Sequence, residues 1–297
     1  MIRLGTRRSA LALAQARWVA ERLEDDVELV PIRTAGDERR GPAPVTTDKA
    51  RFVKELEDAL LAGQIDLAVH SAKDVPAELP SGLIILAVPE RADARDALCG
   101  APDLDALAEG AVVGTASLRR RAELLALRPD LDVRNLRGNV DTRLRRLAEG
   151  QFDAIVLAQA GLDRLGRSDE GSPLDASRFV PAPGQGCLLL EARDADETAF
   201  AATSLTDHAA TTALYIERTI VRALDASCHT PIGVHAVQED ERSASVTAFV
   251  GLPDGSHWIR DELRGEDRSV GLHVAERLLA AGAAELLAAA ELAATPR

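Results

Sequence analysis

Four apolar, strand-like stretches of the sequence each end in a cluster of hydroxyl and cationic side chains. The clusters are Thr6-Arg7-Arg8-Ser9, His70-Ser71-Ala72-Lys73-Asp74, Gly114-Thr115-Ala116-Ser117-Leu118-Arg119-Arg120 and Leu136-Arg137-Gly138-Asn139. Three of them also begin a predicted helix, where unpaired backbone N–H groups and the helix dipole attract anions. Arginine adds two-point recognition of a carboxylate or phosphate. Because ligands of parallel sheets bind beyond the carboxyl ends of the strands, the clusters together predict a crevice for an anion with several charged groups.

Each of these clusters also has a purely structural interpretation. Ser9 and Ser117 could serve only as helix caps, which is the commoner role of serine at such positions. The arginines at 119–121 could form a solvated helix face. Arg143 lies about one turn into the helix that Asn139 would cap, and could pair with a surface acid. His70 ends a buried strand and is predicted to be a core histidine rather than a base or ligand.

Asp74 is the carboxylate best placed for chemistry. It follows Lys73 at the end of a predicted strand and would face the arginines of the other clusters. Nearby cations favour the charged form of a carboxyl group, so Asp74 is expected to stay ionised. It could stabilise a developing cation or accept an N–H proton. The alternative is an aspartate that only forms a salt bridge.

The three cysteines differ in their surroundings. Cys228 lies in a polar loop that ends in Pro231, Ile232 and Gly233, so we predict a reactive or modified thiol there. Cys99 and Cys187 lie beside apolar residues and are predicted to be buried. The odd count gives no disulfide framework and favours a reducing compartment. The sequence has no His/Cys spacing for zinc, no phosphate-binding glycine loop and no serine-hydrolase motif.

The remaining pattern alternates strands and helices. Strands are predicted at 2–6, 27–33, 66–70, 83–88, 111–113, 131–136, 152–157 and 188–191. Helices are predicted from Ser9 to about Leu23, over 51–61, after Ser117 to about Leu127, and after Asn139 to about Ala148. Such alternation implies α/β units with mainly parallel sheets. After residues 181–184 the pattern changes. The strand at 188–191 leads to a helix at 209–224, strands near 234–238, 245–251 and 256–263, and an alanine-rich helix at 269–294. This tail predicts a smaller α+β unit.

Composition narrows the function further. The formal net charge is −13, which argues against nucleic-acid binding because phosphate neutralisation needs a basic surface. No apolar run is long enough to span a bilayer, and the N-terminus does not resemble a secretory signal, so a cytoplasmic location is expected. The three lysines all fall between residues 49 and 73, which hints that ammonium groups have a role there, although chance is an alternative.

Several of these stretches, in this order, carry a resemblance to a known family. They are Thr6-Arg7-Arg8-Ser9, Phe52-Val53-Lys54-Glu55-Leu56-Glu57, residues 68–76, Gly114 to Arg120, Leu136 to Val140, Gly184-Gln185-Gly186, and Cys228 with Pro231-Ile232-Gly233. Through them the sequence resembles the hydroxymethylbilane synthase (porphobilinogen deaminase) family over nearly its whole length. The resemblance implies a transferase that joins four porphobilinogen molecules head to tail, with loss of ammonia, on a covalent dipyrromethane primer. Residues 47–50 depart from the family's usual Gly-Gly-Lys-Gly loop.

The resemblance also assigns roles to residues of this sequence. Asp74 is expected to be the catalytic acid that contacts pyrrole N–H groups and stabilises the cationic azafulvene formed when ammonia leaves. Cys228 is expected to hold the dipyrromethane as a thioether. The cofactor-binding side chains are expected to be Lys73, Ser71, Thr115, Ser117, Arg119, Arg120, Arg137 and Arg143, and the substrate-binding ones Arg7, Ser9 and Arg164.

The family fold implies two periplasmic-binding-like domains and a smaller α+β C-terminal domain. The expected boundaries are 1–92 with 185–206 for the first domain, 93–184 for the second and 207–297 for the third, in a monomer. An alternative from another class is a carboxylate-binding module that shares the two-lobed fold and lacks catalysis. Such a module would need the arginines but would have no use for Asp74 or for a modified Cys228.

Overall fold

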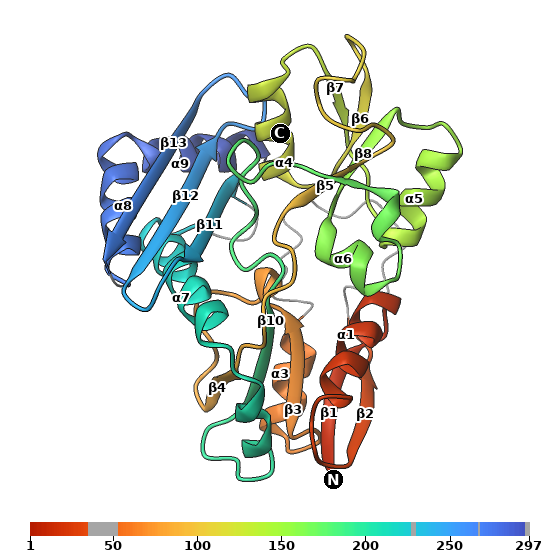
Figure 1. Cartoon of the computed structure of the whole chain (residues 1–297), viewed down its shortest axis with the longest axis vertical. Coiled ribbons are helices and arrows are strands. Elements are labelled where there is room, and N and C mark those ends of the chain that lie inside the picture. The colour runs from red at the N-terminus through yellow and green to blue at the C-terminus, as the bar shows by residue number, and fades with distance from the viewer. Residues whose placement is uncertain (35–52, 227–229, 267, 295–297) are drawn as a thin grey trace.

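The computed structural model describes residues 1–34, 53–226, 230–266 and 268–294. They form three units, each built on its own sheet (Figure 1). The third unit, blue in Figure 1, lies beside the other two and contacts both, through α7 (His208–Ala223) on the first and β12 (Ser243–Gly251) on the second. No helix of the described ranges is long and apolar enough to cross a membrane.

The first unit is a five-stranded sheet in the order β2-β1-β3-β10-β4. Its strands are β1 (Ile2–Arg7), β2 (Val27–Ile32), β3 (Leu67–Ser71), β4 (Leu83–Ala87) and β10 (Leu188–Arg193). Strand β10 is antiparallel to both of its neighbours, so the other four strands point the same way. Helices α1 (Ala10–Ala20) and α3 (Lys54–Leu61) pack on this sheet.

The second unit repeats this arrangement with the order β7-β6-β8-β5-β9. Its strands are β5 (Asp96–Cys99), β6 (Val112–Gly114), β7 (Asp132–Arg134), β8 (Ala154–Ala158) and β9 (Ser172–Pro173), and its helices α4 (Leu118–Leu127), α5 (Val140–Ala148) and α6 (Gln159–Arg164). Here β5 is the reversed strand. The predicted α/β class with mainly parallel sheets is therefore confirmed, although the sequence pattern did not predict β5 or the direction of β10.

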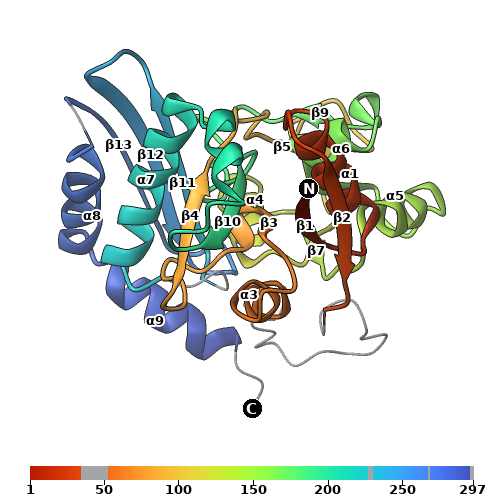
Figure 2. The same ribbon diagram turned by 90° about the horizontal axis from the view of Figure 1, so that it is seen from below.

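The third unit is an antiparallel sheet, β11 (Ile232–Gln238), β12 and β13 (Trp258–Glu266), covered by α7, α8 (Val270–Ala280) and α9 (Ala283–Ala294). This confirms the predicted α+β unit (Figure 2). The single helix predicted over 269–294 is wrong, because the chain breaks at Gly282 with a φ of 95°. A left-handed glycine ends α8 and lets α9 turn back, so that both helices reach β12.

Two chain segments, 88–95 and 174–187, cross between the first and second units and lie side by side. The amide of Ala92 donates to the Gly186 carbonyl at 3.3 Å, and Gln185 Nε2 donates to the Ala94 carbonyl at 2.8 Å. Gly184 and Gly186 have φ values of 73° and 87°. A Cβ on Gly186 would lie 2.4 Å from the Ala92 carbonyl oxygen, so only glycine lets the two segments approach this closely.

Candidate active site

A cavity of about 210 Å³ opens between the first two units. Among its lining residues are eight of the predicted site residues: Arg7, Ser9, Ser71, Lys73, Asp74, Arg120, Arg143 and Arg164. They come from the ends of β1 and β3, from the start of α4, and from α5 and α6, as expected for a crevice at the carboxyl ends of parallel strands. Residues as far apart in the sequence as Arg7 and Arg164 therefore meet at one site.

Local structure places the hydroxyl and carboxylate groups at the cavity. Ser9 caps α1, and its Oγ accepts the amide of Ala12 at 3.2 Å. Directly after β3, a single 3₁₀ turn over Ala72–Asp74 brings Lys73 and Asp74 to the cavity wall. Ser9 thus combines the cap and the cavity positions that the sequence analysis treated as alternatives.

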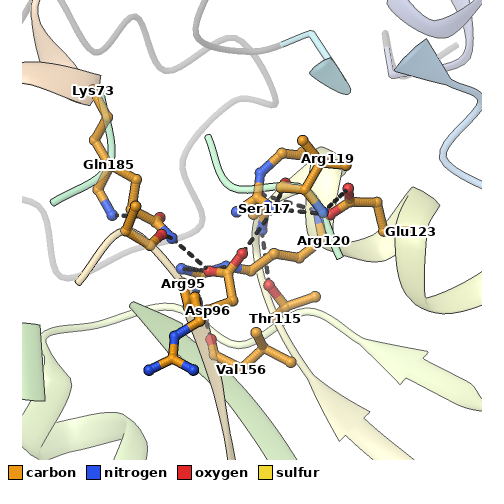
Figure 3. Close-up of polar contacts among 12 residues, drawn as sticks. Lys73, Arg95, Asp96, Thr115, Ser117, Arg119, Arg120, Glu123, Val156 and Gln185 are labelled. Carbon is orange, nitrogen blue, oxygen red and sulfur yellow. Dashed lines mark hydrogen bonds and ion pairs between the residues drawn. The ribbon is translucent and has the colours of Figure 1, made fainter. Parts of the chain in front are cut away.

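Arg119 and Arg120 are held by a buried carboxylate that the sequence analysis did not identify, Asp96 (Figure 3). Asp96 is fully buried and lies 2.8 Å from Arg119 Nη1 and 2.7 Å from Arg120 Nη2. Burial alone would raise the pKa of Asp96, but Arg119 and Arg120 outweigh it and lower this pKa to about 2. Arg119 also pairs with Glu123 at 2.8 Å and does not line the cavity. The alternative of a solvated arginine face at 119–121 is therefore wrong for Arg119 and Arg120, since both side chains are buried.

Arg143 and Arg164 have a different environment. Arg143 Nε donates to the Gly138 carbonyl at 2.7 Å, and Arg164 Nη2 donates to the Gly186 carbonyl at 2.7 Å. Neither guanidinium pairs with a carboxylate of the described residues, so no described acid supports the alternative of a surface ion pair for Arg143. Burial, with a smaller contribution from Arg120, lowers the pKa of Arg143 to about 10, and burial also lowers the pKa of Arg164. Both remain charged at neutral pH and would gain from an anionic ligand.

A hydrogen-bond chain joins the cavity to the buried arginines across the two units. Lys73 Nζ donates to Gln185 Oε1 at 3.1 Å, and Gln185 Nε2 donates to Asp96 Oδ1 at 3.1 Å (Figure 3). Gln185 is buried on a crossing segment between Gly184 and Gly186. Gln15 adds a second link, because its Nε2 donates to Ser71 Oγ at 2.9 Å. Sequence reasoning named neither glutamine as a site residue, although Gln185 stood inside a recognised motif.

The other predicted site residues lie outside the cavity lining. Thr115 is buried and its Oγ1 accepts the amide of Ser117 at 3.2 Å, while Ser117 caps α4. Arg137 is exposed and bonds to no described residue. Cys228 lies outside the described residues, as does Lys49. Of the other two lysines, Lys73 lines the cavity, whereas Lys54 is exposed and pairs with Asp58 at 2.8 Å.

His70 and the two described cysteines agree with the predictions. His70 is buried, with Nε2 3.0 Å from Glu191, which confirms a core histidine. Cys99 and Cys187 are buried as predicted, and burial raises their thiol pKa values to about 11 and about 12. Both thiols are therefore protonated at neutral pH and are poor nucleophiles. Within the described ranges, no group of three or more His, Cys, Asp and Glu side chains could hold a metal ion.

The fold and the cavity define an α/β protein of three units whose central site suits a ligand with several carboxylates. Residues 2–201 match the family model described as porphobilinogen deaminase, dipyromethane cofactor binding domain, and residues 211–280 match that of the porphobilinogen deaminase C-terminal domain. The chain belongs to the porphobilinogen deaminase family.

Relatives agree over nearly the full length. The porphobilinogen deaminase of Thermus thermophilus is 46% identical over 299 residues, which cover 96% of this chain and 97% of the relative. Those of Brevibacillus brevis and Deinococcus radiodurans are each 45% identical, covering 96% and 97% of this chain and 96% and 98% of the relatives. Among solved structures, the methionine binding protein MetQ aligns over 69% of this chain and 89% of its own, with a TM-score of 0.41 and 16% identity.

Proposed function

We propose that this chain condenses four porphobilinogen molecules stepwise, with loss of ammonia, into linear hydroxymethylbilane, and that the cavity between the first two units is its active site. The observation that carries this proposal is the pair Arg143 and Arg164. Both are desolvated cations that bond only to backbone carbonyls, so carboxylates are the ligand groups they lack. Each pyrrole of the substrate and product carries an acetate and a propionate.

The residues at the cavity fit a dipyrromethane cofactor with four carboxylates, because its lining combines several cations and hydroxyl donors with only two carboxylates, Asp74 and Asp141, among the described residues. Its proposed holders are Lys73, Ser71, Arg120 and Arg143 at the cavity, with Thr115, Ser117, Arg119 and Arg137 behind or beside it. Cys228 is the proposed point of attachment. When bound, the dipyrromethane supplies the nucleophilic pyrrole carbon on which the chain grows.

Asp74 is the proposed catalytic residue. It lies on the cavity wall next to Lys73, and its carboxylate would accept the pyrrole N–H of an incoming substrate. As ammonia leaves, positive charge develops on that substrate, and a fixed carboxylate lowers its energy. Arg7, Ser9 and Arg164 are the proposed binding groups for the acetate and propionate of the incoming porphobilinogen. Lys73 is oriented by Gln185, so its ammonium stays at the cavity.

The domain boundaries proposed for this enzyme are 1–92 with 185–206, 93–184 and 207–297. They are supported by the membership of β10 in the first sheet and by the separate antiparallel sheet after α7. We also propose a cytoplasmic monomer that binds no nucleic acid and no membrane. The net charge of −13 supports the absence of nucleic-acid binding.

Asp74→Asn tests the catalytic role. Loss of the carboxylate should lower kcat on the order of 100- to 1000-fold, as removal of one group that stabilises transition-state charge does elsewhere. Intact-mass measurement should still find the dipyrromethane on the protein. The matched control is Asp58→Asn, which removes an exposed aspartate that also neighbours a lysine and should leave kcat unchanged. Near wild-type turnover by Asp74→Asn would contradict the proposed role.

A further inference from the structure

Helix α7 of the third unit holds the chain segment that directly follows Asp74. Arg218, on α7, donates from Nη2 to the Pro76 carbonyl at 2.6 Å and to the Ala77 carbonyl at 2.9 Å, and from Nη1 to the Val75 carbonyl at 3.3 Å. Arg222, one turn further along α7, adds a bond from Nη2 to the Ala77 carbonyl at 3.0 Å. Three consecutive carbonyls therefore point at a single guanidinium.

Arg218 forms no ion pair with any residue that the structure describes. All of its hydrogen bonds go to these three carbonyls, and it is half-buried against the first unit. Burial, with a smaller contribution from neighbouring Arg222, lowers the pKa of Arg218 to about 10, although the buried Glu191 partly offsets both effects. A guanidinium held in this way has no carboxylate to fix its position, so the position of the Arg218 side chain depends on the carbonyls of residues 75–77.

Residues 75–77 depend on these hydrogen bonds because they belong to no helix or strand. Asp74 ends a single 3₁₀ turn that is closed by one bond, from the Val75 amide to the Ala72 carbonyl at 3.2 Å. Pro76 has no N–H to offer, and no helix or strand follows until β4. On the other side of Asp74, Ala72 is fixed by a hydrogen bond that its backbone N–H donates to the Cys187 carbonyl at 3.1 Å. Asp74 is thus held between β3 and the third unit.

We propose that Arg218 is a positioning residue for the reaction. By fixing residues 75–77 against α7, it sets where the Asp74 carboxylate lies in the cavity, and so couples the third unit to the catalytic group. This inference rests on the proposed role of Asp74. Arg218 does not line the cavity, so it acts through the backbone and not on the ligand.

Steady-state kinetics of the holoenzyme test the proposal with Arg218→Gln, Arg218→Lys and the control Arg277→Gln, which breaks an exposed ion pair with Asp261 in the same unit. Displacement of a catalytic group by about 1 Å costs about 100-fold, so Arg218→Gln should lower kcat about 10- to 100-fold. KM should stay within about threefold of wild type because the ligand contacts remain. Arg218→Lys should recover part of kcat, since an ammonium still donates to a carbonyl, and Arg277→Gln should match wild type.

A double-mutant cycle separates positioning from general support of the fold. In an Asp74→Glu background the carboxylate is already displaced, so adding Arg218→Gln should lower kcat by less than about threefold. A wild-type kcat for Arg218→Gln, or an equal loss in both backgrounds, would overturn the proposal. So would a loss explained by the unfolded fraction, measured by thermal melting at the assay temperature. If Asp74→Asn itself keeps turnover, it is the proposed function of Asp74 that fails.

Discussion

Two pairs of arginines lie in the crevice or directly behind its wall, and they are held in opposite ways. Arg119 and Arg120 share the buried carboxylate of Asp96, with nitrogen to oxygen distances of 2.8 Å and 2.7 Å. Arg143 and Arg164 bond only to the carbonyls of Gly138 and Gly186. The sequence analysis expected all four to bind anionic groups of the cofactor or substrate, without distinguishing how each would be held.

The difference teaches that the partner, rather than the residue type, decides what a buried arginine does. A guanidinium that already has a carboxylate stabilises the fold, and removing that carboxylate leaves a buried charge without compensation. A guanidinium held by carbonyls alone keeps most of its charge available for a ligand. Arg120 belongs to both groups, because it pairs with Asp96 and also lines the cavity.

The largest expected effect is on stability, from Asp96→Asn. Loss of the carboxylate leaves buried Arg120 without its carboxylate partner and Arg119 with Glu123 alone, so the free energy of unfolding should fall by about 3–5 kcal/mol. Urea denaturation measures this change. The control Asp261→Asn removes one partner of an exposed ion pair with Arg277 and should cost less than about 1 kcal/mol. Equal losses for the two variants would erase the distinction between the arginine pairs.

The pH dependence of stability gives the next effect. The pKa of Asp96 is about 2 in the folded protein and about 3.9 in an unfolded chain. A lowered folded pKa means that the stabilisation is complete above pH 4 and is lost as the pH falls towards 2. Between pH 5 and pH 2, the difference in unfolding free energy between wild type and Asp96→Asn should therefore shrink by about 2–3 kcal/mol. A difference that stays constant over this range would show that Asp96 is not ionised in the folded protein.

The smallest free-energy change is expected at the cavity arginines. Arg164→Gln should weaken binding of porphobilinogen about 10- to 30-fold, as loss of one charge-assisted hydrogen bond does, and Arg143→Gln should weaken non-covalent binding of the dipyrromethane by a similar factor. Neither arginine pairs with a carboxylate of the described residues, so neither substitution leaves a buried acid without its partner. The unfolding free energy should therefore change by less than about 1 kcal/mol. Binding is measured as KM or by calorimetry on the same preparations used for denaturation. Strong destabilisation with an unchanged KM would move these arginines into the structural group.

Most of the strands and helices could be predicted from the local pattern of apolar and polar residues. Apolar runs such as 66–70 and 188–191, separated by polar turns, predicted the strands, and helix caps such as Ser9 were visible as short motifs. The break at Gly282 was also within reach, since glycine in a run of alanines is a poor helix former. The direction of β10 could not be predicted from the pattern, because a strand has the same side-chain period whichever way it runs.

For the site, too, some features could be predicted from the sequence and others could not. The sequence by itself determined which groups were available: the cations near strand ends, the aspartate at 74, the paired glycines around Gln185 and the overall acidity of the chain. Only the tertiary structure decided their partners, because Asp96 meets Arg119 and Arg120 across more than 20 residues, and Arg218 reaches Val75 across 143 positions. Charge interactions depend on distance and burial, and neither is encoded in the spacing of residues along the chain.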